Sequence, residues 1–372
     1  MRRFIVSLAV ILALSSVAAF GQANGKLQIH FMDVGQGDGA ILIAPSGETV
    51  LFDNGVWNQC PKPMNYLTAL GIKKIDYQII SHYHRDHYGC TAAVLGKFPL
   101  QQLALDRGGS YHDALAFNSY LTSVGNKRRT AIDGQVLTLG AGTANPMTIT
   151  IRALNGNGVD TDNENDQSVV GLVSFGSFRA EIGGDLSGFD TTRYRDIETS
   201  VAPKVGQVDV YKVHHHGSDH STNPAWLQTI HPRIGIVSAG STNTYGHPTE
   251  DTIERLHNAG VKMYWTSKGN GVEPEEGMDV VGGTIIVEVP SATSTTYTVR
   301  PTTAGTTTDT YQTWIAAGGT PPPTSTASFA WSKRSNLYHV STCRIVATIS
   351  PSNLQTGTTP PAGKTLHHDC PQ

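Results

Sequence analysis

The stretch SHYHRDHYG, residues 81–89, places three histidines and one aspartate within six positions. It follows the run IDYQII, which is typical of a buried strand, so the cluster begins where a strand ends. In extended backbone His82 and His84 point to the same side, whereas Asp86 and His87 fall in a turn before a helix-like segment. A solvated loop does not need this spacing. Imidazoles and carboxylates so arranged favour two divalent metal ions, of zinc, manganese or iron, and we favour zinc with manganese as the alternative.

Other segments also place polar side chains at the ends of expected strands. VLFDNG ends on Asp53, where a carboxylate can hydrogen-bond the histidine loop and orient its rings. FRAEIGGD ends on Asp185, and VDVYKVHHHGS ends on a run of histidines. His247 opens the helix-like segment HPTEDTIERL, whose N-terminus favours an anionic oxygen. Three roles remain possible for His247: it is a metal ligand, it contacts a phosphate, or it is an ordinary histidine at the start of a helix.

The segment DVGQGDG, residues 33–39, is rich in glycine. Its alternate glycines permit a tight turn between two strands, and we expect turn chemistry to explain most of the segment. The alternative is that this segment supports the metal-binding loops through Asp33, Gln36 and Asp38. The segment does not resemble a phosphate-binding loop, because no Lys-Ser/Thr pair follows it and no helix starts there.

Taken together, these motifs resemble a known family. HxHxDH after an apolar strand is the signature of the metallo-β-lactamase fold. FMDVGQGDGAILIAPSGETVLFDNG, VYKVHHHGSDHS and YGHPTEDTIERL are similar to its branch of ComEC-like competence proteins. The resemblance covers about residues 27–290, with its motifs in the family's order. It implies an α+β fold, the four-layer αββα sandwich, which agrees with the many short strands and interspersed helices along the chain.

The resemblance also implies roles for individual residues. Asp185 would bridge the two metal ions. One of His215 and His216 would bind the second ion while the other faces the substrate or the bridging water, and we slightly favour His216 as the ligand. His214 would be a neighbour. The implied metal ligands are His82, His84, Asp86, His87, Asp185 and His216, and the implied catalytic residues are Asp86, His215 and His247.

One ligand of the family pattern is missing. Many relatives supply a histidine between the first motif and the bridging aspartate, yet residues 113–213 contain none. Asn165 and Asp166, in DTDNENDQSVV, are the polar substitutes at this place. The first metal ion is therefore expected to be short of a ligand, with a weaker site or one completed by water.

The N-terminus predicts export. Residues 1–24 have the pattern of a cleavable signal peptide, with Arg2 and Arg3 before an apolar run and a small-residue cleavage site at 17–19. A membrane anchor is the alternative, but the apolar run is short for a span. We therefore expect a secreted or periplasmic protein with no stable membrane insertion after cleavage.

Composition suggests how the rest of the chain divides. Residues 25–290 are expected to form the hydrolase domain, and residues 291–328 are a linker rich in Thr, Ser and Pro. Residues 329–372 form a small C-terminal unit that is similar to Ada-like metal-binding modules. The resemblance is carried by Tyr338, His339, Cys343 and Cys370.

The four cysteines suggest disulfides in an exported protein. Their separation along the chain favours the pairs Cys60–Cys90 and Cys343–Cys370. For the second pair a zinc site is the alternative, and we favour the disulfide. That zinc site would use His339, Cys343, Cys370 and either His367 or His368.

Charge and chemistry narrow the function. Loss of Arg2 and Arg3 changes the formal charge from −3 to −5, which gives no support for non-specific nucleic-acid binding. We expect an exported metal-dependent phosphodiesterase or nuclease that uses a metal-bridged hydroxide on a phosphodiester or nucleic-acid substrate. Acyl hydrolysis of a β-lactam or lactone is one alternative. A non-catalytic DNA- or surface-binding protein on the same scaffold is another, and the oligomeric state is open.

Overall fold

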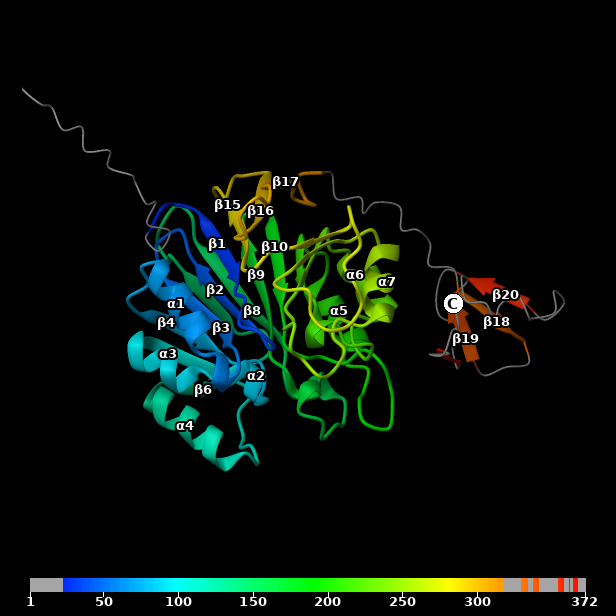
Figure 1. Ribbon diagram of the computed structural model, residues 1–372, viewed down its shortest axis with the longest axis horizontal. Coiled ribbons are helices and arrows are strands. Elements are labelled where there is room, and N and C mark those ends of the chain that lie inside the picture. The colour runs from blue at the N-terminus through cyan, green and yellow to red at the C-terminus, as the bar shows by residue number, and fades with distance from the viewer. Residues whose placement is uncertain are drawn as a thin grey trace, which may run out of the picture.

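The computed structural model describes residues 23–317 and, in the C-terminal unit, residues 329–333, 337–340, 354–357, 361 and 364–366. Within 23–317 two large mixed sheets lie face to face (Figure 1). The first has the order β17-β16-β15-β1-β2-β3-β4-β5-β6, and the second has the order β14-β13-β12-β11-β10-β9-β8-β7.

The first sheet consists of β1 Leu27–Phe31, β2 Gly39–Ile43, β3 Thr49–Asn54, β4 Ile75–Ile79, β5 Leu100–Asp106, β6 Arg128–Thr130, β15 Ile285–Val289, β16 Thr296–Pro301 and β17 Asp309–Gln312. The second consists of β7 Val136–Leu139, β8 Met147–Ala153, β9 Val170–Phe175, β10 Phe178–Ile182, β11 Val210–Lys212, β12 Ile234–Val237, β13 Lys262–Trp265 and β14 Asp279–Val281. The α-helices are α1 Pro61–Ala69, α2 Arg85–Tyr88, α3 Thr91–Lys97, α4 Ala114–Val124, α5 Glu198–Val205, α6 Pro224–Ile230 and α7 Glu250–Asn258.

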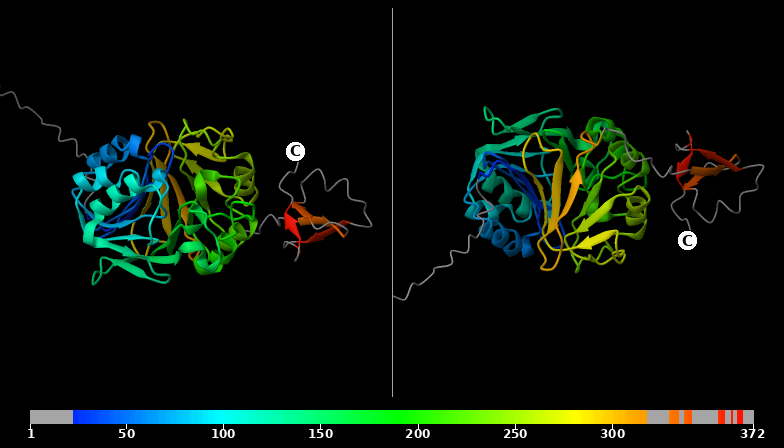
Figure 2. Two further views of the ribbon diagram at one scale, coloured as in Figure 1. Left: turned by 90° about the horizontal axis from the view of Figure 1, so that it is seen from below. Right: turned by 90° about the horizontal axis from the view of Figure 1, so that it is seen from above.

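Apolar side chains hold these layers together. Strand residues such as Phe52 from the first sheet and Phe178 from the second fill the space between the sheets. A second cluster lies between the first sheet and helices α1, α3 and α4, and a third lies between the second sheet and helices α5, α6 and α7. The helices thus cover the outer faces of the two sheets (Figure 2). The expected four-layer αββα sandwich is confirmed.

Parallel strand pairs position the polar motifs. Strand β3 runs parallel to β4, so Asp53 at the end of β3 and His82 in the segment after β4 lie at one edge of the first sheet. Strand β10 runs parallel to β11, which brings Asp185 beside the histidine run after Lys212. Carboxyl ends of parallel strands are where α/β proteins gather polar groups, and both sheets do so here.

The linker predicted to begin at residue 291 is wrong in its first part. Strands β16 and β17 extend the first sheet at its edge, with β16 paired to β15 and β17 paired to β16. In TYTVRP every second residue is buried, including Tyr297 and Val299, so a period-2 strand pattern lies within a Thr-rich composition. Trp314 is also buried, and the Cζ atom of Arg233 lies over the Trp314 ring, 3.7 Å from its centroid. The domain therefore continues to at least residue 317.

Fewer of the expectations about the two ends of the chain can be compared with the structure. The expected signal peptide and the expected linker remainder, 318–328, lie almost wholly outside the described residues. In the C-terminal unit, short strands pair in the order β20-β18-β19-β21. Their bounds are β18 Phe329–Ser332, β19 Leu337–Val340, β20 Leu354–Gly357 and β21 Thr365–Leu366. Cys343 and Cys370 lie outside the described residues, so their pairing stays a prediction. Among the residues that are described, no helix is both long and apolar enough to cross a bilayer.

Candidate metal centre

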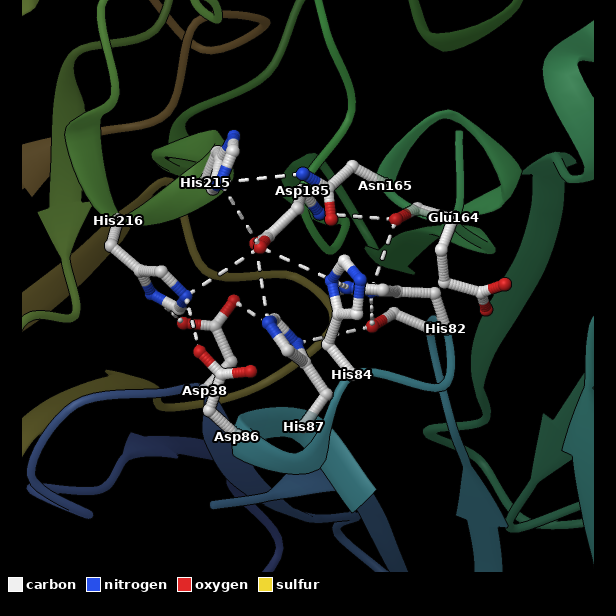
Figure 3. A network of polar contacts seen from close by, with 12 residues as sticks. Asp38, His82, His84, Asp86, His87, Glu164, Asn165, Asp185, His215 and His216 are labelled. Carbon is white, nitrogen blue, oxygen red and sulfur yellow. Dashed lines mark hydrogen bonds and ion pairs between the residues drawn. The ribbon is translucent and has the colours of Figure 1, made fainter. Parts of the chain in front are cut away.

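Asp185 lies at the centre of the polar cluster. Figure 3 shows its carboxylate between the rings of four histidines that come from two separate motifs. The side chain is 3% exposed. Burial alone would raise the pKa of Asp185, but the neighbouring histidine rings hold that pKa well below its ordinary value. The carboxylate is therefore ionised and directed at the point where the motifs meet.

His87 is oriented by Asp53. Its Nδ1 atom lies 2.9 Å from Oδ2 of Asp53, and its Nε2 atom lies 3.3 Å from Oδ1 of Asp185. Asp53 also accepts hydrogen bonds from the backbone N and the Oγ of Ser81, at 2.8 and 2.7 Å. The predicted contact between Asp53 and the histidine loop is confirmed. A carboxylate on one ring nitrogen leaves the other nitrogen directed at a ligand, as in many metal sites.

His216 faces the same point from the second sheet. Its Nε2 atom lies 3.3 Å from Oδ2 of Asp86 and 3.6 Å from Oδ2 of Asp185. Its Nδ1 atom is 2.9 Å from the carbonyl oxygen of Ser238. Burial opposes a charge on the ring, but the carboxylates of Asp185 and Asp38 raise the pKa of His216 to about 10. The same negative charge would attract a cation.

His82 and His84 converge on the other side of Asp185. The Nε2 atom of His82 is 3.0 Å from Nδ1 of His84 and 3.8 Å from Oδ2 of Asp185. Burial, followed by the charge of His87, lowers the pKa of His82 well below its ordinary value. The two imidazoles are therefore neutral and present nitrogen lone pairs, as a metal requires.

His215 and His247 lie on the open side of the cluster. The Nε2 atom of His215 is 3.7 Å from Oδ2 of Asp185, and its ring centroid is 5.4 Å from that of His247. Burial lowers the pKa of His215 to about 3 and that of His247 to about 4. Helix α7 begins at Glu250, so His247 precedes the helix and does not open it. Backbone strain marks the loop, because His215 and His216 both have positive φ.

His214 is turned away from the cluster. Its Nδ1 atom contacts Oε1 of Glu198 at 2.7 Å, and its Nε2 atom contacts Oε1 of Glu181 at 3.1 Å. Both ring nitrogens are therefore occupied by buried carboxylates. This agrees with the expectation that His214 is a neighbour of the site.

The two polar substitutes for the missing histidine behave differently. Asp166 accepts hydrogen bonds from Thr161 Oγ1 at 2.7 Å and from the backbone N of Arg195 at 3.1 Å, which fixes the surrounding loop. Asn165 has its Oδ1 atom buried without a hydrogen bond, and its Nδ2 atom lies 3.4 Å from Nε2 of His215. Of the two, Asn165 is the residue that lines the cavity over the cluster.

Sequence interpretation missed one buried pair. It favoured turn chemistry for Asp38 and gave no role to Lys212, yet Lys212 Nζ lies 2.8 Å from Oδ1 of Asp38 beneath His216. Burial would raise the pKa of Asp38, but Lys212 and His216 outweigh burial and lower it. The available signal was a lysine inside the strand sequence VDVYKV, because a buried lysine needs an acidic partner.

An open cavity of about 930 Å³ lies above the cluster. Its floor includes His84, Asp86 and Asp185, and its walls include Arg193 and Tyr245. The volume is that of a small-molecule or substrate pocket, so the convergent polar groups are accessible from outside.

The donor set fits divalent cations. Nε2 of His87, Nε2 of His216 and Oδ1 of Asp185 are buried and make no well-formed hydrogen bond, although they converge. Ligand atoms of His82, His87 and Asp185 lie within 4.8 Å of one another, as do those of Asp86, His87 and His216. Imidazole nitrogen with carboxylate oxygen suits metals such as zinc and manganese.

The αββα sandwich and the buried histidine–aspartate cluster at its edge define a metal-dependent hydrolase. Residues 39–240 match the family described as the Metallo-beta-lactamase superfamily. The chain belongs to this superfamily.

Three competence-related relatives are similar in sequence. ComE operon protein 3 of Bacillus subtilis (strain 168) is 24% identical over 267 residues, which cover 66% of this chain and 32% of that protein. Recombination protein 2 of Haemophilus influenzae is 27% identical over 257 residues, which cover 68% of this chain and 29% of that protein. Competence protein ComA of Neisseria gonorrhoeae is 26% identical. The expected resemblance to ComEC-like proteins is confirmed, and the chain spans about a third of the length of these relatives.

Two solved structures are also similar to this chain at low sequence identity. The metallo-beta-lactamase fold protein YhfI of Bacillus subtilis is 15% identical, with a TM-score of 0.41, and the match covers 67% of this chain and 99% of that one. The subclass B3 metallo-beta-lactamase MEM-A1 from a soil metagenome library is 15% identical, with a TM-score of 0.36, covering 54% and 83%.

Proposed function

We propose that this chain is an exported phosphodiesterase that cleaves nucleic acid and uses two divalent metal ions, with zinc favoured. The observation that carries the proposal is the convergence of two ligand groups on the Asp185 carboxylate at the floor of an open cavity. Nucleic acid as the substrate is supported by the three similar proteins, whose names refer to competence or recombination.

The family resemblance and the distances together support the ligand roles. The first ion would be held by His82, His84 and Asp185, and the second by Asp86, His87, His216 and Asp185. His84 is assigned to the first group because its Nδ1 atom lies 3.0 Å from Nε2 of His82, and the ligand atom of His87 is also within 4.8 Å of those of His82 and Asp185. Asn165, whose Nδ2 atom lies 3.4 Å from Nε2 of His215, is the polar side chain at the place where many relatives have a further histidine. When bound, such ions supply an activated water at neutral pH and neutralise charge that develops on a phosphoryl oxygen.

The remaining residues act on the substrate. Asp86 is 25% exposed at its side chain and faces the cavity, so it can orient the attacking water through a hydrogen bond as well as bind metal. His215 and His247, neutral at pH 7, can hold a phosphoryl oxygen or the leaving group through their ring nitrogens. Arg193, on the cavity wall with its guanidinium 5.6 Å from the Tyr194 ring centroid, would contact an adjoining phosphate.

Activity of the purified chain tests this reaction. We expect cleavage of bis-p-nitrophenyl phosphate and of single-stranded DNA, its loss with a chelator, and its restoration by a divalent metal. Asp86→Ala should abolish cleavage and lower the bound metal, whereas Asp133→Ala, an exposed aspartate paired with Lys204, should do neither. Hydrolysis of nitrocefin alone would identify an acyl hydrolase instead. Retention of DNA without metal or cleavage would identify a binding protein.

Export has independent support in the structure. Cys60 and Cys90 form a disulfide, as predicted, and disulfides persist in oxidising compartments. N-terminal sequencing of the protein recovered from cell envelope and medium should show a chain that begins near residue 25. Recovery of the protein in the cytoplasm with residue 1 intact would contradict export.

A further inference from the structure

The segment between β1 and β2, residues 33–39, makes contacts that a turn does not require. Its side chain Asp38 is 3% exposed and pairs with Lys212, which is 2% exposed, at 2.8 Å. Lys212 Nζ also donates to the carbonyl oxygen of Val213 at 2.9 Å. Burial of an ammonium and a carboxylate costs several kcal/mol per ion unless the geometry is good, so such a pair does not arise from loop closure alone.

The Asp38 carboxylate continues to His216. Its Oδ1 atom lies 3.3 Å from Nδ1 of His216, the same nitrogen that lies 2.9 Å from the Ser238 carbonyl oxygen. Two acceptors beside one ring nitrogen place the proton on Nδ1. In the neutral ring that metal binding requires, Nε2 then carries the lone pair, and it is directed at Asp86 and Asp185.

The backbone of the same segment holds the turn that carries Asp86. The amide of Asp38 donates to the carbonyl oxygen of Asp86 at 3.1 Å. Gly37 has φ +128°, and a Cβ atom on it would lie 2.2 Å from that same oxygen, so a glycine is needed there. Gln36 accepts a hydrogen bond from the amide of Gly240 at 3.0 Å, which ties the segment to the loop after β12. One segment thus contacts both loops that carry the second group of ligands.

We propose that the buried Lys212–Asp38 pair and residues 36–38 position His216 and Asp86 for the second metal ion. In this proposal Asp38 and Lys212 are positioning residues that act through His216. The ligand atoms of Asp38, Asp185 and His216 also lie within 4.8 Å of one another, but Oδ1 of Asp38 is already paired with Nζ of Lys212. This role rests on the proposed function for the identity of the ligands. It goes beyond that function because it states that a buried ion pair, which is not among the proposed ligands, sets the geometry of the second metal site.

A double variant separates positioning from stability. Lys212→Met alone would leave the Asp38 charge buried without a partner, and such variants often fail to fold. The double variant Lys212→Met with Asp38→Leu removes both charges at similar volume, so it should fold with near-normal stability. If the pair only stabilises the fold, metal binding should be normal too. If the pair positions His216, the affinity for one of the two ions should fall by about 10- to 100-fold while the other is kept.

The measurement is metal affinity by competition with a chromophoric chelator, with stoichiometry from elemental analysis and Co²⁺ absorption as a report on ligand geometry. The matched control is Lys26→Met with Glu288→Leu, which removes an ion pair at 2.7 Å between the residue before β1 and strand β15 and should leave both affinities unchanged. Lys212→Gln with Asp38→Asn provides a second double variant, with the same expected loss, where the first fails to fold, because it also removes both charges and leaves neither Lys212 nor Asp38 as an unpaired buried ion.

Each outcome supports or overturns either the positioning role or the proposed function. Normal affinity for both ions in whichever double variant folds overturns the positioning role. Loss of one ion with the control unchanged supports it. A wild-type chain that binds two ions but cleaves no phosphodiester overturns the proposed function while the positioning role stands. A wild-type chain that binds no ion overturns both.

Discussion

The Nδ1 atom of His87 lies 2.9 Å from Oδ2 of Asp53, and this contact turns the other ring nitrogen toward Asp185. Both side chains are fully buried, and Asp53 has a φ of +52°, an unusual value for a residue other than glycine. The strand end is therefore held in a strained conformation that delivers a carboxylate to the back of a proposed metal ligand.

Asp53→Asn should weaken metal binding without unfolding the protein. The amide oxygen can replace only one carboxylate oxygen, so His87 loses its fixed orientation and part of its basicity, and affinity should fall by about 10-fold or more. Asp76→Asn is the matched control, because Asp76 is a buried aspartate that accepts hydrogen bonds from the backbone N and Oγ1 of Thr49, as Asp53 does from Ser81. Equal losses of metal affinity in the two variants would contradict the orienting role.

The disulfide between Cys60 and Cys90 should make a measurable contribution to stability. It joins residues 30 apart, just before α1 and just before α3. Closing a loop of this size removes conformational entropy from the unfolded chain, and Cys60→Ser with Cys90→Ser should lower the free energy of unfolding by about 3 kcal/mol. Urea unfolding with and without reductant measures this. Reductant should destabilise the wild-type chain by a similar amount, and an oxidised wild type no more stable than the variant would refute the contribution.

Much of the site could be predicted because its residues follow strands. Asp53, His82 and Asp185 each come directly after an apolar run, and strand ends in layered folds meet at shared edges. Local spacing and one general rule about sheets were therefore sufficient to group them. It was harder to predict which of His215 and His216 is the metal ligand. The two residues are adjacent, so the direction of each ring depends on backbone angles that the sequence does not reveal.

The features that sequence reasoning missed depend on contacts across the fold. Asp38 lies in a glycine-rich turn whose local chemistry already accounts for the pattern, and its partner Lys212 belongs to the other sheet. Strand β16 was missed because Thr, Ser and Pro dominate residues 291–328, the segment that contains it, although Tyr297 and Val299 alternate toward the core. For Asp38 the decisive information was a neighbour far along the chain, whereas for β16 it was a local alternation that the composition obscured.

Tyr245 should contribute to the binding of bases if the cavity takes nucleic acid. Its ring is 69% exposed and stacked on His247, with centroids 5.7 Å apart and planes inclined by 26°. Stacking of a base on an aromatic ring is worth about 1–3 kcal/mol, so Tyr245→Ala should raise KM for single-stranded oligonucleotides by about 5- to 100-fold, with a smaller effect on kcat.

Two comparisons isolate stacking by Tyr245 from other effects. Tyr245→Phe keeps the ring and should behave like the wild type. An oligonucleotide with abasic sites offers nothing to stack, so the wild-type chain and Tyr245→Ala should bind it equally. A KM that stays unchanged in Tyr245→Ala for the ordinary oligonucleotide would exclude a base at this position.

His30 should make the fold sensitive to acid. The ring is fully buried between Tyr66 Oη, 2.7 Å from Nδ1, and Gln28 Oε1, 3.1 Å from Nε2. Burial, with a smaller effect of Arg300, lowers the pKa of His30 from 6.5 to about 3. Between these values the unfolded chain binds a proton at this position and the folded chain does not. The stabilisation that His30 provides is therefore complete above pH 6.5 and is lost as the pH falls toward 3.

Comparison with His30→Gln tests this, because the other titrating groups act equally in both chains and cancel. Urea unfolding at about pH 7.5, 6 and 5 should show the wild-type free energy falling more steeply than that of the variant. One histidine contributes up to about 1.4 kcal/mol per pH unit below its unfolded pKa, so the difference between the chains should change by about 2 kcal/mol by pH 5. Parallel curves would mean that His30 takes up its proton in the folded chain as readily as in the unfolded one.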